Sequence, residues 1–302
     1  MDSGRASRTA VFVCQGRAAA HGRLAVNKFS DPIAERLLRE DELAPVRAIR
    51  AATRDDLQIR TAGAAARMSA EAVRAVAQVV VPRTVVIDDA LATAVTAAAG
   101  TQAVLVGAGL DTRPWRLAAL SDVTVFCVDH PASQADARDR ASGLVPVARR
   151  LVFIPVDLTT SRLDPALAAA GHDRAAPTVW VWEGVVPYLT RSDVEATVRA
   201  LADRSAPGSV LVVNYQTPSL VATLGRWVAI LAGRLFSVEP FTANEPWRSL
   251  WTPSDMAHLL AGHGFTIQRD VDLFQVAQGI GSPTRHSRSL RNGRVAIARF
   301  GR

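Results

Sequence analysis

Val104-Leu-Val-Gly107-Ala-Gly109-Leu-Asp111-Thr112 lies in the first half of a chain of 302 residues. A short apolar run leads into two glycines that are separated by one residue, and a helix-like segment follows at Trp115–Leu120. Glycines in such a turn let the backbone adopt unusual dihedral angles and approach a ligand closely. The segment therefore predicts a strand, a tight ligand-binding loop and a helix.

Further apolar runs follow the first one, and each ends at a polar or acidic residue. They are Val123–Val128, Leu151–Val156, Thr178–Trp182 and Val210–Val213. Helix-like segments alternate with them at Ala132–Ala141, Pro165–Ala170 and Asp193–Ala206, the last with Ser192 as its N-cap. Continuously apolar strands that alternate with helices indicate a mostly parallel sheet covered on both faces. We therefore predict a doubly wound, Rossmann-like α/β fold.

The segments on either side of this alternating pattern read differently. Residues 1–90 are helix-like, and we expect them to form a helical cap on a core of residues 91–302. The cap helices are expected at Thr9–His21, from Asp31-Pro32 onward, at Ser69–Gln78 and at Thr84–Ala98. A lid is expected at about 217–251, where aromatic residues could either form the floor of a pocket or pack in the core of the lid: Trp227, Phe236, Phe241, Trp247 and Trp251. A helix from Thr252 to Gly262 and strands at Phe265–Val271 and Arg294–Phe300, joined by a loop over Gly279–Gly293, complete the core.

Composition excludes several classes of protein. The two cysteines, Cys14 and Cys127, are too few for a disulfide framework or a four-cysteine zinc site, and they fit a reducing, cytoplasmic setting. We expect no signal peptide and no membrane span. The formal net charge is +7, but Lys28 is the single lysine and the arginines are scattered, so we do not expect nucleic-acid binding.

Acidic residues follow the predicted strands at the positions where a nucleotide would be bound. Asp129 lies 20 residues after Gly109, as expected of a carboxylate that binds ribose hydroxyls. Asp157 and Glu183 end the next two strands. A dinucleotide fingerprint would have a third glycine where Thr112 stands, and no arginine cluster for a pyrophosphate is visible. A nucleoside with an ammonium and a sulfonium group fits better, which favours S-adenosyl-L-methionine.

Several of these segments together resemble the leucine carboxyl methyltransferase family. They are Val81-Pro82-Arg83-Thr84 with Asp88-Asp89, Val106 to Arg113, Val128-Asp129, Val156-Asp157-Leu158, and Trp182-Glu183-Gly184 with Tyr188-Leu189. The resemblance extends from about Arg8 to Arg299 and is closest to the bacterial branch that includes polyketide O-methyltransferases. It implies a class I methyltransferase sheet and S-adenosyl-L-methionine as the cofactor.

The resemblance also implies roles for the residues around the methionine part of this cofactor. Arg83 would bind the methionine carboxylate as a bidentate ion pair. Arg17 is the nearest candidate for a basic residue of the first helix that assists it. The backbone at Gly107 would meet the methionine moiety, and Glu183 would lie near its ammonium group.

Other residues would bind the nucleoside part and the acceptor. The resemblance implies that Asp129 holds the ribose and that Asp157 and Leu158 hold the adenine. Tyr188 and Tyr215 follow or end two strands, so each could orient an acceptor oxygen.

These observations favour an S-adenosyl-L-methionine-dependent O-methyltransferase that acts on a carboxylate or a hydroxyl of a small molecule. A carboxylate acceptor needs no general base, whereas a phenol would be helped by one. None of the six histidines lies in a recognisable catalytic motif, and His258 and His263 lack zinc-site spacing, so no metal is expected. A nicotinamide-dependent oxidoreductase and a non-catalytic protein that binds an adenosyl ligand or nucleic acid remain alternatives. The oligomeric state cannot be inferred from the sequence.

Overall fold

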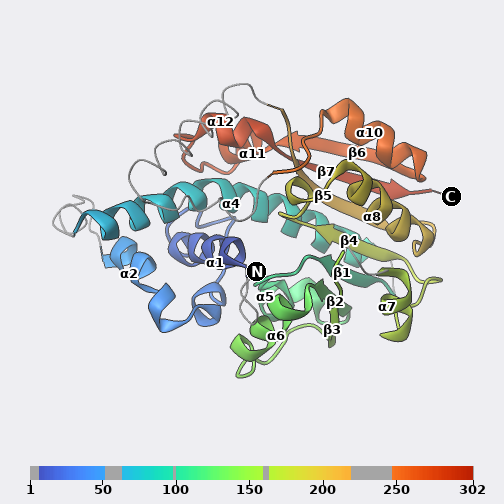
Figure 1. Cartoon of the computed structure of the whole chain (residues 1–302), viewed down its shortest axis with the longest axis horizontal. Helices are drawn as coiled ribbons and strands as arrows, with labels where there is room; N and C mark the ends of the chain where they lie inside the picture. Colours follow the sequence, from blue (N-terminus) through green and yellow to red (C-terminus); the bar gives the residue numbers. More distant parts are fainter. Residues whose placement is uncertain (1–6, 52–62, 98–99, 159–162, 219–246, 302) are drawn as a thin grey trace.

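The computed structural model describes residues 7–51, 63–97, 100–158, 163–218 and 247–301 (Figure 1). Its seven-stranded sheet has the order β3-β2-β1-β4-β5-β7-β6, and β7 runs antiparallel to both of its neighbours. The strands are β1 (Gln102–Val106), β2 (Thr124–Asp129), β3 (Arg150–Pro155), β4 (Thr178–Trp182), β5 (Val210–Gln216), β6 (Phe265–Asp272) and β7 (Gly293–Phe300). The predicted doubly wound α/β fold is confirmed.

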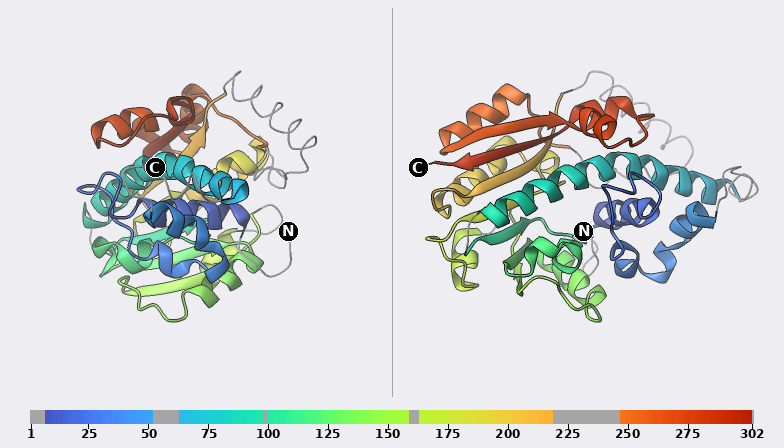
Figure 2. Two further views of the ribbon diagram at one scale, coloured as in Figure 1. Left: turned by 90° about the vertical axis from the view of Figure 1, so that its left-hand side faces the viewer. Right: turned by 180° about the vertical axis from the view of Figure 1, so that it is seen from behind.

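Helices cover both faces of the sheet (Figure 2). They are α1 (Arg8–Ala20), α2 (Ala44–Ala51), α4 (Ala64–Ala97), α5 (Arg113–Arg116), α6 (Pro131–Arg140), α7 (Leu163–Ala169), α8 (Arg191–Asp203), α10 (Pro253–Gly262), α11 (Leu273–Gly279) and α12 (Ser287–Asn292). Alternate strand residues face opposite ways. Val104 and Val106 thus pack with α7, α8 and α10, whereas Ala103 and Leu105 pack with α4, α11 and α12.

The register of the parallel strands brings three predicted site residues to one edge of the sheet. Val106 pairs with Val128 on one side and with Trp182 on the other. Gly107, Asp129 and Glu183 directly follow Val106, Val128 and Trp182. They therefore emerge together at the carboxyl edge, where ligands bind in open α/β sheets.

Helix α4 differs most from the prediction. We expected separate helices at Ser69–Gln78 and Thr84–Ala98, but α4 is one helix of 34 residues with Pro82 inside it. Its first part packs against α1 and α2, and its last part packs against β4 and β5 (Figures 1 and 2). Burial of residues 80–87 on these neighbours stabilises the helix through the proline. The domain boundary expected at residue 90 falls within α4, and the division into two domains stays a prediction.

Smaller differences concern helix ends. Asp31 accepts a hydrogen bond from the Ala34 amide at 3.0 Å, but it begins only a short 3₁₀ helix at Ala34–Leu37. Helix α8 is capped by Thr190 rather than Ser192, because the Thr190 hydroxyl accepts from the third residue of the helix. The loop expected over Gly279–Gly293 contains helix α12.

The expected lid is only partly described, because residues 219–246 lie outside the described ranges and contain Trp227, Phe236 and Phe241. Trp251 is buried in the core beside α8 and α10, and its indole N–H donates to the Ser249 hydroxyl at 3.1 Å. Neither Trp247 nor Trp251 lines the pocket described below, and of the two alternatives Trp251 follows the one of core packing. The helices that the structure describes include none long and apolar enough to cross a bilayer.

A buried histidine predicts how stability depends on pH. His172 lies against the rings of Phe126 and Trp180, and its Nε2 is 3.0 Å from the Thr178 hydroxyl. Burial lowers the pKa of His172 from 6.5 to about 4. As pH falls, the imidazole of His172 therefore binds a proton in the unfolded chain before it does so in the folded one. The free energy of unfolding should decrease by about 3 kcal/mol between pH 6.5 and 4.

Urea unfolding across this pH range tests that prediction in wild type and in His172→Gln, which retains a partner for Thr178. The variant should lose less stability on acidification than wild type does. Equal losses in the two proteins would show that another group carries the acid sensitivity.

Candidate active site

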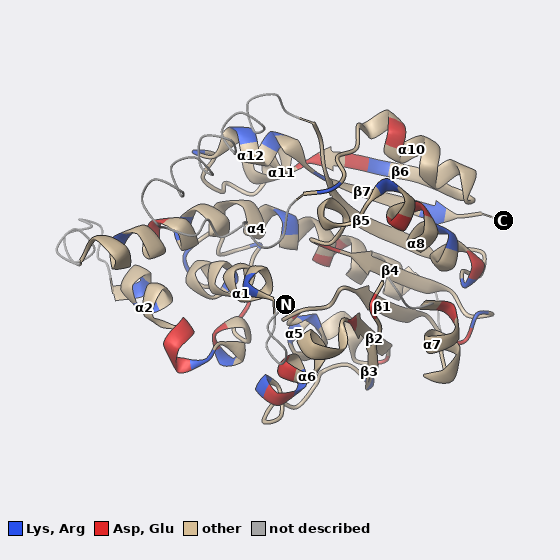
Figure 3. Ribbon diagram, viewed as in Figure 1, with Lys and Arg blue, Asp and Glu red and all other residues tan. Residues whose placement is uncertain are grey.

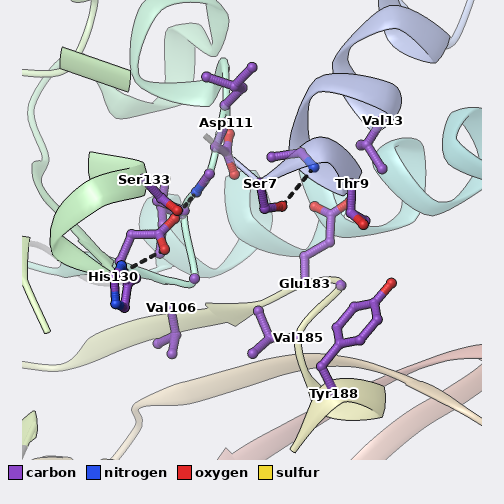
Figure 4. Close-up of a pocket in the computed structure, with 18 of the residues that line it drawn as sticks. Ser7, Thr9, Val13, Val106, Asp111, His130, Ser133, Glu183, Val185 and Tyr188 are labelled. Carbon is purple, nitrogen blue, oxygen red and sulfur yellow. Dashed lines mark hydrogen bonds between the residues drawn. The ribbon is translucent and has the colours of Figure 1, made fainter. Parts of the chain in front are cut away.

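A pocket of about 500 Å³ opens at the carboxyl edge of β1, β2 and β4 (Figure 4). The N-terminus of α1 forms one wall, and the loops after β1, β2, β3 and β4 form the others. Its lining contains Ser7, Thr9, Ala10, Val13, Arg17, Arg83, Leu105, Val106, Gly107, Ala108, Gly109, Leu110, Asp111, Asp129, His130, Ser133, Val156, Asp157, Leu158, Val181, Glu183, Gly184, Val185, Tyr188, Leu189 and Arg248.

The loop after β1 has a shape that requires its glycines. Gly107 and Gly109 have φ angles of +70° and +51°, which other residues rarely adopt. A Cβ atom on Gly107 would overlap a methyl carbon of Val185, and one on Gly109 would lie 3.2 Å from the Cβ of Ala10. The backbone of this loop therefore lies tightly between α1 and the segment after β4, and it is open to the pocket.

Asp129 stands at the end of β2 with both carboxylate oxygens turned to backbone amides. Oδ2 accepts from the Gly109 N–H, and Oδ1 accepts from the His130 N–H at 2.6 Å. Burial raises the pKa of Asp129, although the N–H groups of Gly109 and His130 favour its ionised form. Each oxygen has a further lone pair that can accept from a ligand hydroxyl. Asp157 and Leu158, which follow β3, line the same pocket.

Glu183 lies between two arginines. Its Oε1 accepts from Arg83 Nε at 2.6 Å, and its Oε2 is 2.7 Å from Arg113 Nη2. Burial alone would raise the pKa of Glu183, but the positive charges of Arg113 and Arg83 outweigh burial and lower it. The carboxylate is therefore ionised and held in place, and it fixes Nε of Arg83 while that side chain faces the pocket.

These residues belong to a larger cluster of opposite charges beneath the loop after β1. Arg113 also binds Asp88 and Asp111, and Arg116 binds Asp88 at 2.7 Å. Figure 3 shows the basic and acidic positions along α4 and the basic ones on α5. The members, called the charge cluster below, are Arg17, Arg83, Arg113, Arg116, Asp31, Asp88, Asp111 and Glu183.

The charge cluster contains four arginines that the sequence does not show as a group. The sequence shows no arginine cluster for a pyrophosphate, but in the fold Arg17, Arg83, Arg113 and Arg116 gather near the loop from segments far apart in the sequence. Each is matched by a carboxylate, so the cluster does not provide a set of free cations for a pyrophosphate. Arg17 donates to the Leu110 carbonyl, and its Nε is 3.1 Å from Asp31 without hydrogen-bond geometry.

The structure separates the two tyrosines that were predicted to orient an acceptor. Tyr188 lies in the short helix η4 (Val186–Tyr188) and lines the pocket beside Glu183 (Figure 4). Tyr215 is fully buried, and its hydroxyl donates to Asp270 Oδ2 at 2.6 Å. The expectation for Tyr215 is wrong because this strand residue faces the core and its hydroxyl is taken up by β6.

Comparison with known proteins assigns the family. A family model described as leucine carboxyl methyltransferase matches residues 10–202, which include Arg17, Arg83, the loop after β1, Asp129 and Glu183. The chain belongs to the leucine carboxyl methyltransferase family. Within this part of the chain, and elsewhere among the described residues, no three His, Cys, Asp or Glu side chains gather to hold a metal ion.

Relatives from actinobacteria are provisionally named as S-adenosyl-L-methionine-dependent methyltransferases. SCO7813 of Streptomyces coelicolor is 34% identical over 194 residues, which cover 63% of each chain. A protein of Mycobacterium ulcerans is 35% identical over 169 residues, covering 55% of this chain and 53% of its own. The present chain thus matches less than two thirds of the length of these curated relatives.

Solved structures show the same fold at low sequence identity. A DUF574 family protein from Streptomyces avermitilis has a TM-score of 0.54 and 18% identity, over 80% of this chain and 92% of that one. A possible exported protein from Bordetella parapertussis has a TM-score of 0.53 and 17% identity, over 99% of this chain and 98% of that one. These similarities concern the fold alone.

Proposed function

We propose that the chain binds S-adenosyl-L-methionine and transfers its methyl group to an oxygen of a small-molecule acceptor. A carboxylate is the first candidate for that oxygen and a hydroxyl the second, in a polyketide or other secondary metabolite. The observation that carries the proposal is one pocket with Asp129 on one side and the Arg83–Glu183 pair on the other. The family and the names of its relatives support the same cofactor.

The described residues fit the cofactor at both ends. On the nucleoside side, the free lone pairs of Asp129 are suited to the ribose hydroxyls, and Asp157 and Leu158 are placed to meet the base. On the methionine side, Arg83 uses only its Nε for Glu183 among the described residues, so its two Nη groups are available for a carboxylate.

When bound, the sulfonium group supplies a methyl carbon that an acceptor oxygen can attack in line as the carbon–sulfur bond breaks. The protein then has to align the two reactants and keep water away. Val185 and Leu189 give the pocket an apolar wall next to Tyr188. The Tyr188 side chain, which lines the pocket, would orient the acceptor oxygen.

The lining favours an acceptor that is already ionised. Figure 4 shows His130 beside Ser133, on the opposite side of the pocket from Tyr188. Glu183 is a weak base because Arg113 and Arg83 lower its pKa. Among the described lining residues, no histidine stands beside Tyr188 to deprotonate a phenol. A carboxylic acid, with a pKa of about 4, needs no such base.

Calorimetric titration with S-adenosyl-L-methionine, S-adenosylhomocysteine and NADH tests the cofactor. We expect dissociation constants on the order of micromolar for the two adenosyl ligands and no binding of NADH. Binding of NADH alone would replace the proposal with an oxidoreductase, and binding of none of the three would contradict the assignment of the pocket.

A further inference from the structure

One guanidinium group at the pocket is not paired with any residue that the structure describes. Arg248 lines the pocket and is exposed, and no described residue forms an ion pair or side-chain hydrogen bond with it. The other lining arginines differ in this respect, since Arg17 is paired with Asp31 and Arg83 with Glu183. Arg248 therefore contributes a positive charge that the described residues around it do not neutralise.

The backbone around Arg248 is fixed next to Tyr188. The Arg248 N–H donates to the Pro187 carbonyl at 2.6 Å, one residue before Tyr188. The hydroxyl of buried Ser249 donates to the Val186 carbonyl at 3.1 Å. These bonds hold the base of the Arg248 side chain against η4, so its charge is placed on the side of the pocket where the acceptor would enter.

The nearby lining suits the rest of an organic acid. Val13, Val185 and Leu189 are apolar and line the same pocket. Helix α1 has 13 residues and presents its N-terminus there through Ser7 and neighbouring residues, which adds a partial positive charge. Four carboxylates among the described lining residues act against this positive charge. Asp111 and Glu183 are paired with arginines of the charge cluster. Asp129 and Asp157 follow β2 and β3, on the side proposed for the nucleoside.

We propose that Arg248 is a specificity-determining residue that binds the carboxylate of the methyl acceptor, an organic acid with an apolar body. The proposal rests on the proposed function, and it adds a residue outside the segment that the family model matches. Methylation would convert the bound carboxylate into a neutral ester and remove its ion pair with Arg248. The protein should therefore bind the acid more tightly than the corresponding methyl ester.

The test uses protein saturated with S-adenosylhomocysteine and two acids of different shape, phenylacetate and octanoate, each paired with its methyl ester. Calorimetry is done on wild type, Arg248→Gln, Arg248→Lys and the control Arg199→Gln. Arg199 is exposed on α8, and among the described residues its one ion pair is with Glu195 at 3.8 Å; it does not line the pocket.

We expect at least one acid to bind wild type and Arg199→Gln more tightly than its ester does. Arg248→Gln should weaken binding of that acid by about tenfold or more and leave the ester unchanged, and Arg248→Lys should restore part of the loss. Equal acid affinity in wild type and Arg248→Gln would overturn the proposal. So would a failure of both acids to bind the saturated wild type. A failure of S-adenosylhomocysteine itself to bind would instead contradict the proposed function, and its affinity should be the same in all four proteins.

Discussion

Asp129→Ala should bind S-adenosylhomocysteine at least about 100-fold more weakly than wild type does, which is the largest effect that we expect from a single substitution. Two losses add up in this variant. The ribose hydroxyls lose a charged acceptor, and the amides of Gly109 and His130 lose the carboxylate that now holds them. The loop after β1 would then no longer be fixed in the shape that meets the ligand.

Calorimetry measures this effect, and thermal unfolding of the same samples separates ligand binding from damage to the fold. Asp122→Ala is a matched control, because Asp122 is an exposed carboxylate shortly before the same strand. Its affinity should equal that of wild type. Unchanged affinity in Asp129→Ala would remove the nucleoside from this side of the pocket.

Arg83→Gln should weaken binding of S-adenosylhomocysteine by about 10- to 100-fold, because a bidentate ion pair with the methionine carboxylate is lost. 5′-Methylthioadenosine contains the same nucleoside but neither the carboxylate nor the ammonium group of methionine. Its affinity should therefore change little in Arg83→Gln, whereas Asp129→Ala should weaken both ligands.

Arg83→Lys refines this test, since lysine retains the charge but not the planar geometry that binds Glu183 and a carboxylate together. We expect intermediate affinity for S-adenosylhomocysteine. A parallel loss of both ligands in Arg83→Gln would mean that Arg83 acts through the structure of the pocket. An unchanged affinity for both ligands would place the methionine carboxylate elsewhere.

Much of the fold could be predicted from the sequence because buried parallel strands are apolar throughout and stand out between helices. The five parallel strands β1 to β5 lie where such runs occur, and β6 and β7 lie where the last two strands were expected; the ends differ by only a few residues. Helix α4 was predicted as two helices. Pro82 follows three valines, and the helix propensities of these residues give no reason for a helix to continue through them. Packing on both the N-terminal helices and the sheet outweighs that preference.

The site was predictable where a residue ends a strand, because strand ends meet at one edge of the sheet whatever lies between them. This rule placed Gly107, Asp129 and Glu183 in one pocket. It failed for Tyr215, whose side chain faces the core. Asp88 and Arg113 were missed as partners because 25 residues separate them, and only the folded chain shows that α4 passes beneath the loop.

Helix α4 has a consequence for the rate at which a ligand can enter. Arg83 and Asp88 stand within this continuous helix, between the part that packs on α1 and the part that packs on the sheet. The described N-terminal helices therefore cannot swing away from the sheet as a hinged body unless α4 bends. The pocket walls that α1 and α4 form, on the side proposed for the methionine part of the cofactor, are therefore in position before the ligand arrives. Association should then be a single bimolecular step whose observed rate rises in proportion to ligand concentration, without a plateau set by domain closure.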